Sequence, residues 1–164
     1  MIRCVSPADG AAICEIYNYY IENTVISFEE TPLTRPEMED RIQKISAAYP
    51  YLVWEDEDGI VNGYSYVNRW RERSAYKFTA ETSIYLRNGF QGRGMGSKLM
   101  EKLLDEVRKT DIHCLIAGIA LPNDNCAALH EKFGFKKIAH FEEVGFKRGR
   151  LIDVGNWELV LSRP

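Results

Sequence analysis

The 164-residue chain lacks several features that would point to particular classes of protein. Its four cysteines form no Cys-x-x-Cys pair and have no histidine at ligand spacing, so neither a disulfide framework nor a metal site is expected. No apolar run approaches the roughly 18 residues of a membrane span, and the N-terminus lacks the apolar core of a signal peptide. These absences predict a cytoplasmic protein with reduced thiols at Cys4, Cys14, Cys114 and Cys126.

An excess of charge of one sign is also missing. The formal net charge is −3, and acidic and basic residues are mixed along the chain. There is no broad basic face for nucleic acid and no polybasic run for a membrane surface, so small-molecule partners are expected. With 45% hydrophobic residues, the chain is long enough for one core and too short for two ordinary ones. Residues 1–164 are therefore predicted to form a single domain.

Strand and helix patterns alternate along the chain, without repeats or low-complexity segments. Helices are predicted over 6–23, 33–49, 95–109 and 123–135, and strands over 2–5, both arms of 51–70, 76–86, 113–120 and both arms of 136–161. Ser6 or Asp9 is the expected cap of the first helix, and Thr34 with Glu37 has the spacing of a capping box. The pattern predicts an α+β (layered α/β) fold with a mostly antiparallel central sheet flanked by helices.

The segment SIYLRNGFQGRGMGSKLMEKLLDEV passes from a strand into three alternating glycines and then into an amphipathic helix. A Walker loop does not fit, because no Ser or Thr follows Lys98, and a dinucleotide fingerprint does not fit, because Ser97 stands where its third glycine would be. Small residues let backbone N–H groups approach an anion, and the helix that follows offers further unpaired N–H groups. Gly92, Gly94 and Gly96 therefore predict a pyrophosphate-binding loop.

Residues 91–96, QGRGMG, resemble the Q/R-x-x-G-x-G/A motif of the GNAT N-acetyltransferases. The resemblance covers essentially the whole chain and is strongest to the phosphinothricin and methionine sulfoximine acetyltransferases, through segments such as AYKFTAETSIYL, LHEKFGF and GFKRGRLIDVGNWEL. It implies the GNAT fold, in which a mixed sheet splays open in the middle, and acetyl-CoA as co-substrate, with no metal. The cofactor-binding residues that it implies are Ile84, Tyr85, Leu86, Gln91, Gly92, Arg93, Gly94, Met95, Gly96, Ser97 and Asn123.

Two residues are candidates for proton transfer. An amine arrives as ammonium and must lose a proton before it can attack a thioester. Glu81 lies in an otherwise apolar strand, where partial burial would raise its pKa, and the resemblance implies that it is the base; a solvated outer-face residue is the alternative. His130 stands where many family members have the Tyr that protonates the departing thiolate. It can act as acid or base, or serve only in packing.

Substrate recognition is implied by the resemblance at Phe28, Arg71, Arg73 and Tyr76. A glutamate-like amino acid with a phosphinate or sulfoximine group needs cations for its oxygens and an aromatic wall for its chain, and arginine offers a bidentate fork. The alternative for both arginines is an exposed surface position without a role in binding.

Three functions remain open. An N-acetyltransferase acting by direct attack on a small glutamate-like amino acid is favoured. An acetyltransferase for peptide or protein N-termini or another small amine is the near alternative, and a CoA-binding sensor without turnover is the distant one. The resemblance also implies a homodimer, for which Phe141, Phe146 and Trp157 of the last two strands offer apolar surface.

Overall fold

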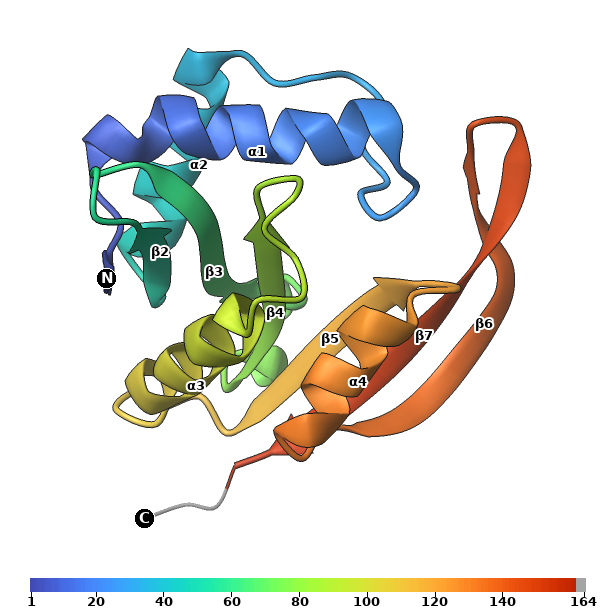
Figure 1. The fold of residues 1–164 in the computed structure, drawn as a ribbon. Coiled ribbons are helices and arrows are strands. Elements are labelled where there is room, and N and C mark those ends of the chain that lie inside the picture. Colours follow the sequence, from blue (N-terminus) through green and yellow to red (C-terminus); the bar gives the residue numbers. More distant parts are fainter. Residues whose placement is uncertain (162–164) are drawn as a thin grey trace.

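The computed structural model describes residues 1–161 of the chain. Along these residues the elements are β1 (Ile2–Cys4), α1 (Gly10–Asn23), α2 (Arg35–Ser46), β2 (Tyr51–Glu55), β3 (Val61–Arg69), β4 (Thr79–Leu86), α3 (Met95–Val107), β5 (Cys114–Ala120), α4 (Asp124–Lys132), β6 (Lys136–Lys147) and β7 (Arg150–Val160) (Figure 1). The predicted α+β class is confirmed.

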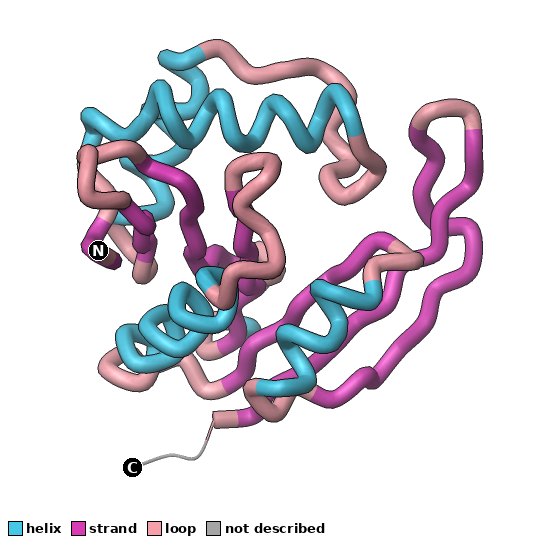
Figure 2. Tube along the Cα trace, in the orientation of Figure 1, coloured by secondary structure: helices cyan, strands magenta, loops and turns pink. Residues whose placement is uncertain are grey.

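The strands form one sheet in the order β1-β2-β3-β4-β5-β7-β6. Neighbours are antiparallel except β4 and β5, which are parallel and pair over only three residues each, ending where Glu81 lies opposite Ile116. Beyond that pair the two strands separate, and Figures 1 and 2 show the resulting opening between the two halves of the sheet. The expected mixed, mostly antiparallel sheet that splays in the middle is therefore confirmed.

Helices cover both faces of the N-terminal half of the sheet. Side chains alternate along β2: Tyr51 and Val53 belong to the core beneath α1 and α2, whereas Leu52 belongs to the core beneath α3. The apolar stripe predicted for α3 is buried on this second core, with Leu99 and Leu103 at 0% exposure. Helix α4 lies against β5 in the C-terminal half. No helix in residues 1–161 is long and apolar enough to cross a membrane.

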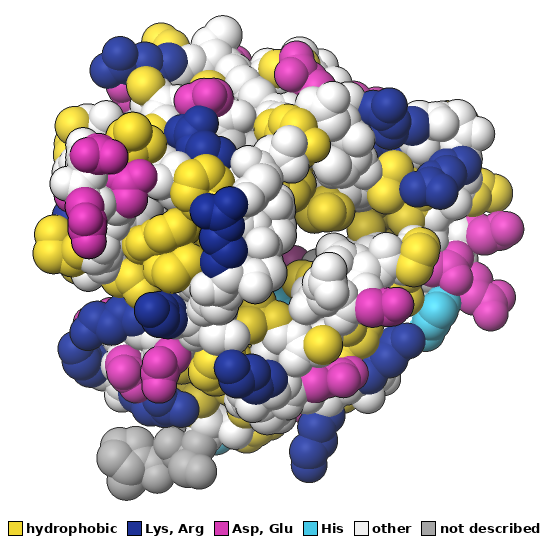
Figure 3. Space-filling model, viewed as in Figure 1, with side chains coloured by type: hydrophobic (Ala, Val, Ile, Leu, Met, Phe, Trp, Pro, Cys, Tyr) yellow, Lys and Arg dark blue, Asp and Glu magenta, His cyan; other side chains and the backbone are white. Residues whose placement is uncertain are grey.

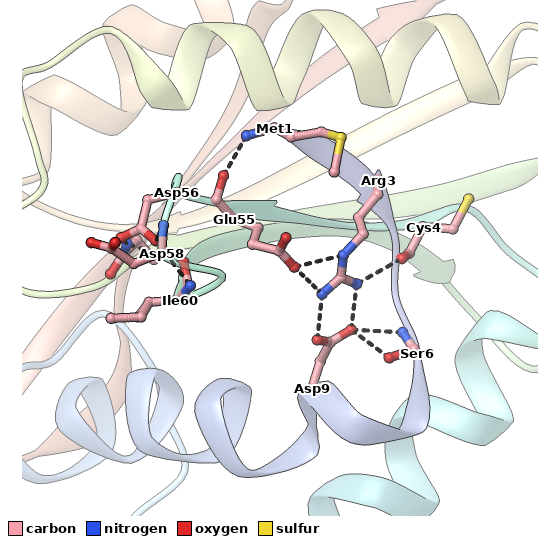
Figure 4. Close-up of polar contacts among 10 residues, drawn as sticks. Met1, Arg3, Cys4, Ser6, Asp9, Glu55, Asp56, Asp58 and Ile60 are labelled. Atoms are coloured by element: carbon pink, nitrogen blue, oxygen red, sulfur yellow. Dashed lines mark hydrogen bonds and ion pairs between the residues drawn. The ribbon is translucent and has the colours of Figure 1, made fainter.

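Arg3 ties the N-terminal strand to its neighbours (Figure 4). Its guanidinium donates two hydrogen bonds of 2.8 Å to the carboxylate of Asp9 and two, of 2.8 and 2.5 Å, to Glu55. Burial pushes the pKa of Asp9 upward, but hydrogen bonds from Arg3 and Ser6 outweigh it, so the pKa lies below its ordinary value. The bidentate pair fixes the start of α1 against β1 and β2.

Two local predictions can be compared with the structure. The capping box of α2 is confirmed, because the Thr34 N–H donates to Glu37 Oε2 at 2.7 Å. The strand predicted over 76–86 begins later, at Thr79. Residues 74–76 form a 3₁₀ turn instead, in which the Tyr76 N–H donates to the Arg73 carbonyl at 3.0 Å. These turn hydrogen bonds outweigh the strand propensity of the aromatic residues.

Candidate active site

A cavity of about 560 Å³ lies beside the part of β4 that has no β5 partner. Figure 3 shows this face of the molecule hollowed between the part that carries α1 and the part that carries α4. Two residues predicted to bind the cofactor, Arg93 and Met95, are not among those that line the cavity. The other nine do line it: Ile84, Tyr85, Leu86, Gln91, Gly92, Gly94, Gly96, Ser97 and Asn123.

The glycine loop exposes its main chain to this cavity. Gly92 and Gly94 have φ angles of 76° and 78°, in the left-handed region that side chains rarely adopt. An ideal Cβ on either residue would meet nothing within 4 Å, so there is open space beside the backbone. Gly94 is also the N-cap of α3, whose first N–H groups have no partner inside the helix. The loop therefore suits an anion such as the pyrophosphate of acetyl-CoA.

Helix α1 also contributes to the cavity, which the sequence pattern did not indicate. The Tyr20 hydroxyl donates to the Leu86 carbonyl at 2.6 Å and accepts a hydrogen bond of 3.3 Å from the Gln91 side chain. Lys132 of α4 lines the other side and donates to Ser97 Oγ at 3.1 Å. Helical periodicity assigns a tyrosine to a buried face, but it gives no information on a contact made 66 residues away.

Glu81 is the last residue of β4 that pairs with β5, at the point where the sheet begins to open. Its carboxyl is partly buried, and burial raises its pKa above the ordinary value for glutamate. Oε1 lies over Gly118 of β5, 3.3 Å from the position that a Cβ of Gly118 would occupy. The raised pKa makes this carboxylate a stronger base than an exposed glutamate, as a group that accepts a proton requires.

His130 lies in the core, only 2% exposed, and on α4 as predicted. Its Nδ1 is 2.8 Å from the Cys126 carbonyl, which can only accept, so Nδ1 carries the proton. Nε2, 3.3 Å from Thr82 Oγ1, therefore accepts from that hydroxyl. Burial lowers the pKa of the imidazole despite the hydrogen bond to Cys126, so the ring is neutral at neutral pH. Neighbouring side chains of a strand point to opposite faces. His130, which is hydrogen-bonded to Thr82, therefore lies on the opposite face of β4 from the Glu81 side chain.

The predicted substrate residues lie on two segments of the chain, one just before β4 and one after α1. The Arg71 guanidinium lies 4.4 Å from the ring centre of Trp70 and 5.7 Å from that of Tyr76. Arg71 and Arg73 are both exposed, and Arg73 immediately precedes the 3₁₀ turn. Phe28 lies on the segment between α1 and α2.

The ring of Phe28 packs directly over Gly145 of β6. A Cβ on Gly145 would be 2.5 Å from the Phe28 ring, so only glycine leaves room for this contact. Two residues further along, the Lys147 ammonium, 4% exposed, donates to the Ser27 carbonyl at 2.7 Å. Arg148 donates to the carbonyl of Glu22 at 2.5 Å. We call these contacts of the end of α1 and the segment after it with the tip of the β6–β7 hairpin the clasp; Figure 1 shows the two parts facing each other beside the opening in the sheet.

Comparison with known proteins gives a consistent result. The model of the acetyltransferase (GNAT) domain matches residues 2–155. The phosphinothricin N-acetyltransferase of Streptomyces viridochromogenes is 37% identical over 163 residues, which cover 99% of this chain and 88% of that enzyme. The L-methionine sulfoximine/L-methionine sulfone acetyltransferase of Salmonella typhimurium is 35% identical over 165 residues, covering 98% of this chain and 94% of that enzyme.

A solved structure agrees with the sequence comparisons. An acetyltransferase from Salmonella typhimurium, determined with its cofactor acetyl-CoA, matches with a TM-score of 0.96 and 34% identity, covering 99% of this chain and 94% of that one. Together with the glycine loop and the split sheet, these similarities establish the family. The chain belongs to the GNAT family and is an acetyl-CoA-dependent N-acetyltransferase.

Proposed function

We propose that the enzyme acetylates the amino group of a small glutamate-like amino acid of the phosphinothricin or methionine sulfoximine type. Two relatives that match nearly the whole chain are named for these acceptors. The observation in the structure that carries the proposal is the position of Glu81. This carboxyl, with its raised pKa, stands where the sheet opens, three residues before the cofactor cavity begins at Ile84.

Glu81 is the proposed base, and it takes the proton that the acceptor ammonium must lose. Acetyl-CoA supplies the acetyl group, activated as a thioester. Transfer by direct attack, without an acetylated enzyme, is supported by the state of the cysteine in the cavity. Burial raises the pKa of the Cys126 thiol to about 11, so this group is a neutral thiol near neutral pH and a poor nucleophile.

His130 stays a predicted acid–base residue, and its burial restricts how it could act. A proton moving between its Nε2 and the opening would have to pass through the Thr82 hydroxyl. Arg71 and Arg73 stay the predicted ligands of the acceptor's acidic group, with Tyr76 and Phe28 as aromatic walls. Exposure leaves both guanidinium groups accessible to such a ligand.

An assay of thiol release from acetyl-CoA tests the proposed function. Phosphinothricin, methionine sulfoximine, glutamate and a peptide with a free N-terminus would be compared as acceptors. We expect turnover with phosphinothricin and methionine sulfoximine. Glu81→Gln should lower the turnover rate by a factor of about 10²–10⁴. The affinity for acetyl-CoA should be unchanged in this variant. Acetylation of the peptide alone would favour an enzyme for protein N-termini. Binding of acetyl-CoA without turnover of any amine would favour the sensor.

We also propose that the protein is a homodimer formed through the β6–β7 hairpin. Strand β6 lies at the edge of the sheet, where unpaired strands readily associate. Trp157, predicted for this interface, is 2% exposed and donates to Glu131 at 2.9 Å, so it belongs to the core instead. The large apolar side chains exposed on the two strands are Ile138, Phe141, Val144, Phe146, Leu151 and Val160.

Light scattering tests the assembly. Phe146 is 66% exposed, and Phe146→Asp should convert a dimer into a monomer because it places a charge in the apolar surface. Ile60, 50% exposed before β3 and away from the hairpin, provides the matched control Ile60→Asp, which should leave the mass unchanged. A monomeric parent protein at micromolar concentration would contradict the proposal.

The cytoplasmic location stays a prediction.

A further inference from the structure

The side-chain oxygen of Asn156 lies beside the Glu81 carboxylate above Gly118. A Cβ on Gly118 would lie 3.3 Å from Glu81 Oε1 and 3.5 Å from Asn156 Oδ1. Asn156 of β7 pairs directly with Gly118 across the sheet, whereas Glu81 comes from β4 on the other side of β5. Two side chains from the strands that flank β5 therefore converge on one point above its backbone.

That point is open to solvent although it lies in the middle of the sheet. Gly118 is exposed, whereas its neighbours Ala117 and Ile119 are 1% and 4% exposed. Pairing between β4 and β5 ends two residues earlier, at Ile116, so the exposed backbone is the floor of the opening. Burial is the sole cause of the raised pKa of Glu81, which means that no cation of the protein neutralises this carboxylate.

We propose that Asn156 binds the acceptor's amino group above Gly118, together with Glu81. This inference rests on the proposed function and adds a residue to its acceptor site. Two acceptor oxygens directed at one point suit a ligand that donates hydrogen bonds, and an ammonium has several N–H donors. One proton passes to the Glu81 carboxylate, a second N–H still donates to Asn156 Oδ1, and the lone pair that is released becomes the nucleophile.

The neutrality of Asn156 matters for this role. An aspartate at the same place would add a negative charge beside Glu81, which would raise the pKa of both the carboxyl group and the bound ammonium. The amine would then bind well but lose its proton less readily. An asparagine orients the amine without this penalty, and the glycine beneath it leaves the space that the amine needs.

Steady-state kinetics of two variants test the inference, with methionine sulfoximine as the acceptor. Asn156→Leu keeps the size but removes the acceptor oxygen, and it should raise the KM for the amino acid about 10- to 100-fold, as loss of a hydrogen bond to a charged group does. The KM for acetyl-CoA should stay within about twofold of the parent value. Asn156→Asp should keep the amino-acid KM low, reduce kcat and move the acidic limb of the pH–rate profile to higher pH.

An unchanged amino-acid KM in Asn156→Leu would overturn the inference. So would an equal rise in both KM values together with a lower Tm, because that result indicates a role in packing. If the parent enzyme acetylates another amine and not methionine sulfoximine, the proposed acceptor is wrong, and the same variants measured with the accepted amine still decide the role of Asn156. If it acetylates none, calorimetric binding of methionine sulfoximine to the parent and to Asn156→Leu decides it.

Discussion

Replacing Gly94 with alanine should weaken acetyl-CoA binding more than it weakens the fold. A Cβ at φ 78° costs roughly 1–2 kcal/mol of folding free energy, and no atom within 4 Å adds a clash. Gly94 lines the cofactor cavity, where a Cβ would keep the pyrophosphate from the main chain. Loss of one hydrogen bond to that charged group, about 1.5–3 kcal/mol, raises the Kd about 10- to 100-fold. Calorimetry measures the Kd, and urea denaturation measures the stability.

Gly59 provides a closely matched control. It has the same φ of 78° and the same open space around a Cβ, but it lies in the turn between β2 and β3, outside the cavity. Gly59→Ala should therefore lose a similar free energy of unfolding and keep the acetyl-CoA Kd of the parent. An unchanged Kd in Gly94→Ala would refute the pyrophosphate assignment. Weaker binding in both variants would mean that affinity follows stability instead of the loop.

Three titratable groups give further expected outcomes. Burial raises the pKa of Glu81, so ionisation of this group opposes folding. Urea denaturation across pH should show Glu81→Gln to be more stable than the parent at alkaline pH, with no difference in acid. Burial lowers the pKa of His130, so the parent loses stability as the pH falls through the ordinary histidine range, and His130→Phe should flatten this loss. The variant should also lose about 1–3 kcal/mol of unfolding free energy, because the Thr82 hydroxyl loses its acceptor. Lys147→Met removes the hydrogen bond from Lys147 to Ser27 in the clasp, and it should speed amide exchange over residues 24–30 and raise the amino-acid KM. Lys136→Met, at the exposed opposite end of β6, should do neither.

The geometry of the glycine loop was predictable because its signal is local. Alternating glycines between a strand and an amphipathic helix favour both the open backbone geometry and a helix terminus that can bind an anion, whatever the rest of the chain does. The positive φ angles of Gly92 and Gly94 and the cavity beside them agree with that reading.

Contacts between distant segments were not predictable in the same way. Spacing places His130 on α4, but its burial depends on where Thr82 of β4 lies, which no period in the sequence encodes. The resemblance names Phe28 as a substrate residue, but its packing over the vacant side-chain position of Gly145, more than a hundred residues away, could not be read from the sequence. Trp157 reads as an interface residue by composition, and only the packing of β7 against the core shows otherwise.

The split in the sheet links the stability of this enzyme to its chemistry. Strand β4 pairs with β3 on one side from Ala80 to Leu86, but its other side has a partner only from Thr79 to Glu81. Each main-chain group left without a strand partner forgoes a hydrogen bond worth about 0.5–1.5 kcal/mol, so the opening lowers the stability that a closed sheet would have. The same opening exposes the unpaired edge of β4 to an extended ligand and places Glu81 where that edge begins. Because the two halves share so short a pairing, the clasp at Lys147 supplies a second connection between them across the opening. A closed sheet would be more stable, but it would bury Glu81 and Gly118 against each other and leave no room for the proposed acceptor site.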